Sequence, residues 1–119
     1  MSFFKRIFTR KKKVPGQEIK KPAVIERMAA PETIKEGQIL RIVVSGFFSN
    51  LSWSMDEAEA NTKNNDITVF VIGKKKAGVM AAQVLKPYET TVEVKKLKKG
   101  RYKIKAAKGP ASTLELEVK

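Results

Sequence analysis

The sequence predicts an all-β fold, a sandwich of seven or eight short antiparallel strands that follows a basic amphipathic arm. After residue 22, apolar and polar residues alternate in several short runs, with the period of two that a half-buried strand requires. Gly, Pro and Asn separate these runs at short intervals, as is typical of sandwiches. A chain of 119 residues suits one domain. We therefore expect an arm and linker over residues 1–22 and the sandwich over residues 23–119.

The arm is the most strongly charged part of the chain. The formal net charge is +13, and residues 1–22 contribute eight Lys or Arg against one Glu. Residues 2–13 have helical periodicity, with the apolar side chains on one arc of the helix. The apolar residues are Phe3, Phe4, Ile7 and Phe8, and the basic residues of the arm are Lys5, Arg6, Arg10, Lys11, Lys12 and Lys13. Pro15 and Gly16 are expected to end the helix, and Pro22 marks an extended linker.

Neither an export signal nor a transmembrane helix is expected. Lys5 and Arg6 interrupt the apolar run after Phe4, so the hydrophobic region of a signal peptide does not form. No stretch approaches the roughly 20 apolar residues that a transmembrane helix needs. The absence of cysteine fits a reducing compartment. We expect a cytoplasmic protein that is soluble or peripheral at a membrane.

The first strands follow the linker. Residues 24–30 are expected to form a strand that Pro31 stops, and Glu36 and Gly37 are expected to form a turn. Residues 38–45 alternate between apolar and polar, which predicts a second strand. The inward side chains of this strand are expected to be Leu40, Ile42 and Val44.

The middle of the chain is less regular. A short strand is expected over residues 51–55, whereas residues 56–66 are polar, acidic and rich in Asn, which predicts a loop or a frayed helical turn. Residues 67–72 are apolar on both faces, as in a buried strand. A hairpin turn at residues 74–78 is expected to link them to a strand over residues 79–85.

The last third alternates clearly after Pro87, which interrupts the pattern. Strands are expected over residues 90–95, 101–106 and 114–118. Folding of the last two strands about a turn at Gly109-Pro110 would place Lys105 opposite Glu115 and Lys103 opposite Glu117.

Four segments in this order resemble immunoglobulin-like modules of bacterial exported proteins and lipoproteins. They are Val44-Ser45-Gly46-Phe47, Ile67-Thr68-Val69, Pro87-Tyr88-Glu89-Thr90-Thr91-Val92 and Leu97-x-x-Gly100-x-Tyr102-x-Ile104. The resemblance covers about residues 38–118 and implies an immunoglobulin-like sandwich. Those modules often carry a cysteine pair, whereas Ser52 and Ala81 stand at the corresponding places here.

Two aromatic residues are expected in the core. Tyr102 resembles the tyrosine corner, in which the hydroxyl group hydrogen-bonds to the backbone of the preceding turn; the alternative is an ordinary core tyrosine. Trp53 is expected to anchor the core, with stacking on a ligand as the alternative.

No residue set demands an enzymatic reaction. The chain has no histidine, and therefore lacks the commonest general base and imidazole metal ligand. The acidic residues Asp56, Glu57, Glu59 and Asp66 lack the spacing of a calcium loop, so we expect a solvated loop there. We expect no catalytic residues, no metal site, no cofactor and no small-molecule substrate.

Two basic regions outside the arm are candidate contacts for a polyanion. Their residues are Lys74, Lys75, Lys76, Lys95, Lys96, Lys98, Lys99 and Arg101. A solvated basic surface is the alternative to a nucleic-acid groove, because the aromatic residues that single-strand recognition uses are absent between these lysines. Arg101, Lys103 and Lys105 share one face of their predicted strand, and Glu115 and Glu117 are expected to cancel part of the charge of that face.

The arm therefore dominates the functional hypothesis. A basic amphipathic segment binds an anionic membrane surface, fills a groove on a protein partner or covers its own domain. We expect a non-enzymatic binding or structural module that docks through the arm on an anionic membrane surface or a larger protein assembly. The alternative is a nucleic-acid-associated protein, an accessory component of a ribonucleoprotein.

Overall fold

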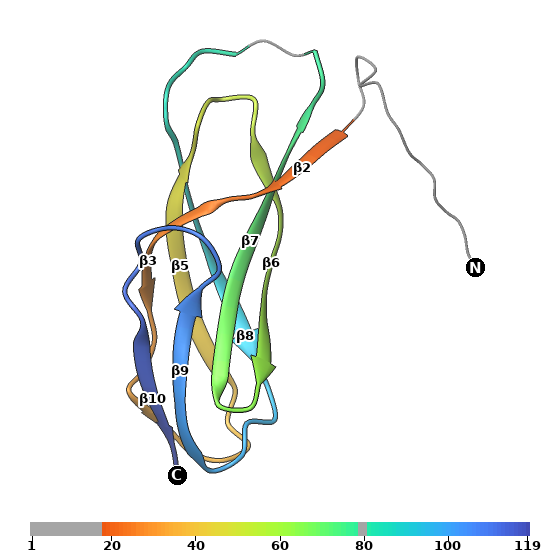
Figure 1. Cartoon of the computed structure of the whole chain (residues 1–119). Helices are drawn as coiled ribbons and strands as arrows, with labels where there is room; N and C mark the ends of the chain where they lie inside the picture. Colours follow the sequence, from red (N-terminus) through yellow and green to blue (C-terminus); the bar gives the residue numbers. More distant parts are fainter. Residues whose placement is uncertain (1–17, 79–80) are drawn as a thin grey trace, which may run out of the picture.

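A computed structural model describes residues 18–78 and 81–119, and these residues form nine strands and no helix (Figure 1). The strands are β2 (Glu18–Pro22), β3 (Val24–Ala29), β4 (Thr33–Ile34), β5 (Leu40–Phe48), β6 (Ser54–Lys63), β7 (Asp66–Lys76), β8 (Lys86–Val94), β9 (Gly100–Ala106) and β10 (Leu114–Val118). They form one sheet of six strands and one of three. The predicted all-β sandwich is confirmed, with nine described strands in place of seven or eight.

The core fills the space between the two sheets. Side chains from alternate positions of the strands point inward, because successive side chains of a strand lie on opposite faces. The largest fully buried side chains are Ile25, Leu40, Ile42, Val44, Ile67, Val69, Val71, Ile104 and Leu116. The inward face predicted for residues 38–45 is confirmed, and the strand continues to Phe48.

The small sheet has the order β3-β5-β8, with β5 in the centre. Both pairings are antiparallel, and β5 pairs with β8 from Leu40 opposite Val94 to Phe48 opposite Lys86. β8 begins before the strand predicted for residues 90–95 and includes Pro87. An edge strand tolerates proline because one side of its backbone needs no ladder partner.

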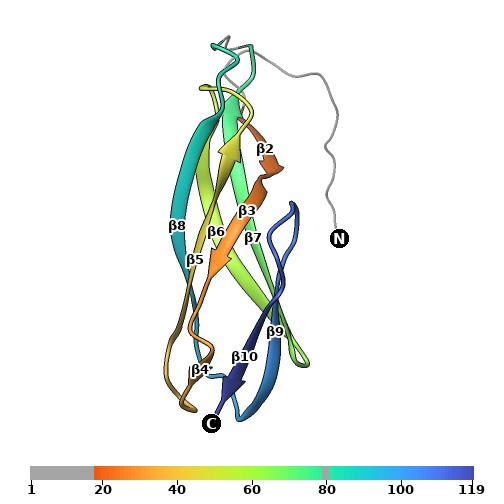
Figure 2. The same ribbon diagram turned by 90° about the vertical axis from the view of Figure 1, so that its left-hand side faces the viewer.

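The large sheet is built around β7. One side of β7 pairs with β6 from Asp66 to Lys74, whereas the other side is shared by β2 near one end and β9 near the other. β10 and β4 continue the sheet beyond β9, and β4 lies beside β10 near the C-terminus (Figure 2).

Two pairings correct the prediction that all strands are antiparallel. β7 pairs with β9 in parallel, and so does β10 with β4. The parallel pairing of β7 with β9 follows from the chain path. After β7 the chain crosses to the small sheet, where β8 runs back to the far end of β7, so β9 enters the large sheet in the same direction as β7 (Figure 1).

The acidic segment is a strand rather than the predicted loop. β6 covers residues 54–63 and pairs with β7, and Asn64 adopts a left-handed φ of 56° in the hairpin turn that joins them. Ala58 and Ala60 are half-buried and pack against the core. The strand predicted for residues 51–55 is wrong in its limits, because residues 51–53 precede β6 in a turn.

The predicted hairpin between residues 67–72 and 79–85 is also wrong. Lys74, Lys75 and Lys76 belong to β7, where β2 pairs with all three and β6 pairs with Lys74 on the other side. Residues 81–85 form no strand, and the next strand, β8, pairs with β5 in the other sheet.

The strands predicted for residues 101–106 and 114–118 are confirmed, but their register differs by two residues. Lys103 lies opposite Glu115, and Arg101 lies opposite Glu117. The reason is that the connection is longer than a tight turn at Gly109-Pro110. It extends to β3, where the Ile25 N–H donates to the Lys108 carbonyl oxygen at 2.8 Å.

The tyrosine-corner contact predicted for Tyr102 is present. Its hydroxyl group donates a hydrogen bond to the Lys98 carbonyl oxygen at 2.8 Å, and its ring is buried. Leu97, which precedes this turn, is buried in the same core. The contact closes the loop between β8 and β9.

The residues assigned to the linker include a strand. β2 begins at Glu18 and pairs antiparallel with β7, so residues 18–22 belong to the large sheet. Ile19 packs against the core, and the Ala23 N–H donates to the Val71 carbonyl oxygen at 2.8 Å. The amphipathic segment predicted for residues 2–13 lies outside the described residues.

Candidate docking surface

One end of the sandwich carries Lys74, Lys75 and Lys76, which form one of the two basic regions singled out in the sequence. We call it the arm end, because β2 begins there and the chain enters the fold at residue 18 (Figure 1). The same end holds the β5–β6 loop (residues 49–53) and the connection between β7 and β8. The opposite end, called the far end, holds the β6–β7 turn and the β8–β9 loop.

Three large apolar side chains are exposed at the arm end. Leu51 is 48% exposed, Val84 56% and Leu85 62%. We call these residues the apolar tip. The Leu51 N–H donates to the Ala82 carbonyl oxygen at 3.3 Å, so the two contributing loops lie side by side. The tip is a feature that the sequence prediction missed, because it had placed both segments in strands.

Trp53 anchors the β5–β6 loop, which also carries Leu51 of the apolar tip. Its side chain is only 8% exposed and belongs to the core, which confirms the predicted core anchor. The Lys86 ammonium group donates to the Trp53 carbonyl oxygen at 2.8 Å, and the Lys75 Nζ lies 5.2 Å from the ring centroid, within cation–π range. These contacts fix the orientation of the β5–β6 loop.

The Trp53 site also requires a glycine on the neighbouring strand. A Cβ atom on Gly73 would lie 2.7 Å from Cε1 of the Phe48 ring and 3.4 Å from the Trp53 ring. The absence of a side chain at Gly73 therefore makes room for the two aromatic rings that support the loop.

Several lysines lie at the arm end, and some of them have acidic partners. Lys74 lies 3.7 Å from Asp56 and 3.9 Å from Glu18, and Lys20 lies 3.2 Å from Asp56. The hydrogen bond and charge of Asp56 raise the pKa of Lys20 above its ordinary value. Asp56 thus belongs to an ion-pair cluster and not to a solvated loop.

Other lysines at this end retain uncompensated charge. Among the ion pairs of residues 18–78 and 81–119, none involves Lys75, Lys76 or Lys86. Lys76 is exposed at the end of β7, and Lys86 begins β8. The arm end therefore combines exposed apolar side chains with net positive charge.

The two basic regions singled out in the sequence lie at opposite ends. At the far end, β7 begins at Asp66, which lies opposite Lys103 of β9. At the usual rise of a strand, Lys74 lies about 27 Å from Asp66 along β7. The residues from Lys95 to Arg101 occupy the far end (Figure 1). This separation exceeds the Debye length of about 8 Å at physiological salt, so the two regions act independently.

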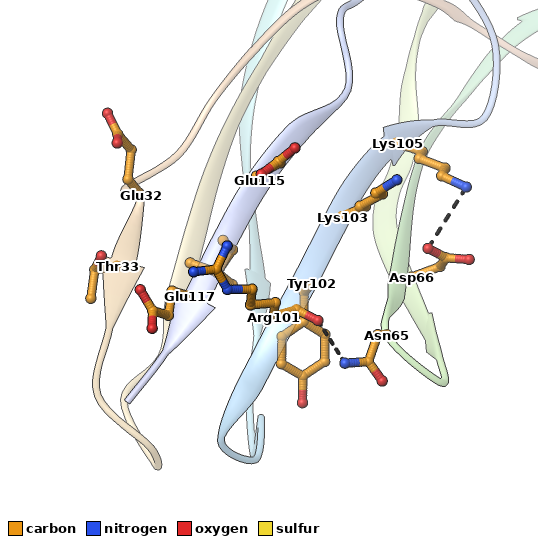
Figure 3. A pocket seen from close by; sticks show the side chains of 11 residues that line it. Glu32, Thr33, Asn65, Asp66, Arg101, Tyr102, Lys103, Lys105, Glu115 and Glu117 are labelled. Atoms are coloured by element: carbon orange, nitrogen blue, oxygen red, sulfur yellow. Dashed lines mark hydrogen bonds and ion pairs between the residues drawn. The ribbon is translucent and has the colours of Figure 1, made fainter.

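A charged groove of about 550 Å³ lies on the outer face of the large sheet (Figure 3). β9 contributes a basic column, Arg101, Lys103 and Lys105, which lies between acidic residues of its neighbours. The acidic lining residues are Glu32, Asp66, Glu115 and Glu117. The groove alternates in sign and is therefore no continuous polyanion surface.

Specific contacts tie the basic column to the β6–β7 hairpin (Figure 3). Lys105 Nζ lies 3.7 Å from Asp66 Oδ1, and the Asn65 side-chain amide donates to the Arg101 carbonyl oxygen at 2.6 Å. Lys105 thus pairs with Asp66 instead of the predicted Glu115. Of the four acidic residues singled out in the sequence, the other two, Glu57 and Glu59, are exposed on β6.

The described part of the chain contains no group of three or more acidic residues placed to hold a metal ion. It also contains no helix long and apolar enough to cross a membrane. The basic and apolar arm residues predicted to dock, from Phe3 to Lys13, lie outside the described residues.

A family model described as the ORF11 beta-sandwich domain matches residues 42–116, more than half of the chain. The chain belongs to this family. Neither a search of curated proteins nor a search of solved structures found a match.

The ORF11 beta-sandwich domain covers the strands from β5 to β10. The matched range includes the apolar tip, Lys74 to Lys76 and the whole β8–β9 loop. It excludes the arm, β2, β3 and β4, so the strand that joins the arm to the sheet lies outside the matched range.

Proposed function

We propose that this chain is a non-enzymatic binding module that docks through its arm on an anionic membrane surface. The observation that carries the proposal is the place of β2. Its first residue, Glu18, lies opposite the exposed Lys76 at the arm end, so the arm joins the fold beside the lysines at the end of β7. Arm and lysines can then approach one anionic surface together.

The composition of the arm supports a membrane as that surface. Each basic residue near an anionic bilayer contributes about 1 kcal/mol, and apolar side chains add to this by entering the interface. Residues 1–17 have six basic and no acidic residues, with Phe3, Phe4, Ile7 and Phe8 between them. A cytoplasmic location peripheral at a membrane is part of this proposal.

Vesicle sedimentation tests the proposal. We expect the full chain to sediment with phosphatidylserine-containing vesicles and less with phosphatidylcholine vesicles, and deletion of residues 2–13 to abolish sedimentation. Circular dichroism of the deleted protein checks that the sandwich remains folded. Equal sedimentation of the deleted protein would contradict docking through the arm.

The full-length and arm-deleted proteins also test the two other partner classes, a nucleic acid and a larger protein assembly. RNA binding whose affinity falls steeply with salt, without vesicle binding, would overturn the membrane proposal in favour of a nucleic-acid-associated role. Stable capture of a protein partner through the arm, again without vesicle binding, would overturn it in favour of a larger assembly.

We also infer that the sandwich is a variant of the immunoglobulin-like fold. The Tyr102 corner and the antiparallel β5–β8 and β9–β10 pairings support this relation. The parallel pairing of β7 with β9 departs from an immunoglobulin-like sheet. An experimental structure without the Tyr102 hydrogen bond and with a different strand order would contradict the inference.

A further inference from the structure

We propose that the apolar tip is a second membrane contact, which enters the interface of an anionic bilayer beside the arm. This inference rests on the proposed function, because it adds a second element to the same docking surface. The occupant is a lipid bilayer with anionic headgroups. The side chains that enter it are Leu51, Val84 and Leu85.

The exposure of the tip is the first argument. Large apolar side chains that lie on one surface in a cluster mark an interaction site, whereas scattered ones are ordinary. Of the five exposed large hydrophobic residues among the described ones, three belong to the tip, and two lie on the outer face of β5. The tip residues come from two loops that a backbone hydrogen bond holds together.

The second argument is charge, which favours lipid headgroups. Lys76 lies opposite Glu18 at the start of β2, and Lys75 and Lys86 contact Trp53 in the β5–β6 loop. In the described part of the chain none of these three lysines has an acidic partner. Two acidic residues of this end, Glu18 and Asp56, are ion-paired with Lys20 and Lys74. Apolar side chains beside uncompensated lysines match a bilayer interface, which is apolar below an anionic surface.

The third argument is support from beneath the tip. Trp53 is buried, accepts the Lys86 hydrogen bond at its carbonyl oxygen and lies under Lys75. These contacts hold the β5–β6 loop before it meets a membrane. Less conformational entropy is then lost when Leu51 inserts.

Substitutions in the full chain test the contact. We expect the double variant Leu51→Ser/Leu85→Ser to bind phosphatidylserine vesicles about tenfold more weakly than the unsubstituted protein, because two apolar side chains no longer enter the interface. Val43→Ser is the matched control, since Val43 is also exposed but lies on the face of β5 away from the loops. Its binding is expected to stay unchanged.

Depth measurement gives a second, independent readout. In a Trp53→Phe background, a tryptophan introduced as Leu85→Trp is expected to be quenched by brominated lipids, whereas one introduced as Lys98→Trp at the far end is not. Circular dichroism checks the fold of each variant. If Trp53→Phe prevents folding, the serine variants alone decide the result.

The outcomes separate this inference from the proposed function. Unchanged vesicle binding of the serine variant, together with loss of binding on deletion of the arm, would overturn the tip contact and leave the proposed function intact. Absence of vesicle binding by the full chain would overturn both. Loss of binding by Val43→Ser equal to that of the double variant would also overturn a specific tip contact.

Discussion

Two tyrosine hydroxyl groups donate hydrogen bonds to backbone carbonyl groups, one locally and one between distant segments of the chain. Tyr102 donates to the Lys98 carbonyl oxygen within one loop, and Tyr88 donates to the Val24 carbonyl oxygen at 2.6 Å across the small sheet. Both rings are buried, and Tyr88 also packs against Phe48, with ring centroids 4.9 Å apart. A buried carbonyl group without its donor costs free energy, so both bonds are expected to matter for stability.

Tyr102→Phe tests the corner contact. We expect the free energy of unfolding to fall by about 0.5–1.5 kcal/mol, because the ring stays and only the hydrogen bond to Lys98 is lost. Urea unfolding followed by fluorescence of Trp53 measures the change. A variant as stable as the unsubstituted protein would show that the corner contributes nothing to stability.

Tyr88 predicts a dependence of stability on alkaline pH. Burial, with a smaller contribution from the charge of Glu26, raises its pKa from 10.0 to about 12. The unfolded chain therefore loses the phenolic proton first. The contribution of Tyr88 is complete below pH 10 and is lost as the pH rises through about 12.

Urea unfolding at a series of pH values, with Tyr88→Phe as the comparison, measures this contribution. We expect the difference in unfolding free energy between the two proteins to shrink above pH 10, the ordinary pKa of the phenol. A difference that stays constant up to pH 12 would contradict a raised pKa of Tyr88 in the folded protein.

At the scale of elements, β5 depends on close contact with both of its neighbours. Gly46 faces inward, where a Cβ atom would overlap the Val24 carbonyl oxygen and lie 2.8 Å from the Tyr88 hydroxyl oxygen. The missing side chain therefore permits the hydrogen bond between Tyr88 and Val24. This is why glycine lies in the middle of a buried strand, where it otherwise weakens a sheet.

Gly46→Ala is expected to lower the free energy of unfolding by about 1–3 kcal/mol, because β3 and β8 must move apart. Ser45→Ala in the same strand is the control, since Ser45 points to the opposite face and is half-buried. Thermal unfolding compares the two. Equal midpoints would argue against the close approach at Gly46.

The elements also differ in how well the sequence predicted them. β5, β9 and β10 were predicted because their inward apolar residues alternate with polar ones. β6 was missed because its inward residues are alanines among polar residues, a pattern typical of a loop. Its backbone pairing with β7 makes it a strand, and that pairing leaves no local trace in the sequence.

At the scale of the whole molecule, β2 determines where the sandwich begins. Deletion of residues 2–17 is expected to leave the free energy of unfolding unchanged. Deletion of residues 2–22 is expected to lower it by about 2 kcal/mol, because β7 loses a neighbouring strand and the core loses Ile19. Urea unfolding of the two proteins measures the difference. Equal stability would show that β2 does not belong to the stable sandwich.

The candidate docking surface was also predictable from the sequence only in part. The lysines and the arm are visible as charge runs, so the strongly basic character of the chain was predictable from composition. The apolar tip was not, because Leu51, Val84 and Leu85 look like strand residues among other apolar residues. The assignment of β7 and β8 to different sheets leaves Val84 and Leu85 in the connection between them, and Leu51 lies in the β5–β6 loop.

The sequence by itself determined the all-β class, the inward faces of the alternating strands and the Tyr102 corner, because each depends on local spacing. The tertiary structure decided the sheet membership of β8, the parallel pairing of β7 with β9 and the two-residue shift between β9 and β10. These depend on which distant backbone satisfies the N–H and C=O groups of a strand. Local periodicity contains no information on that choice.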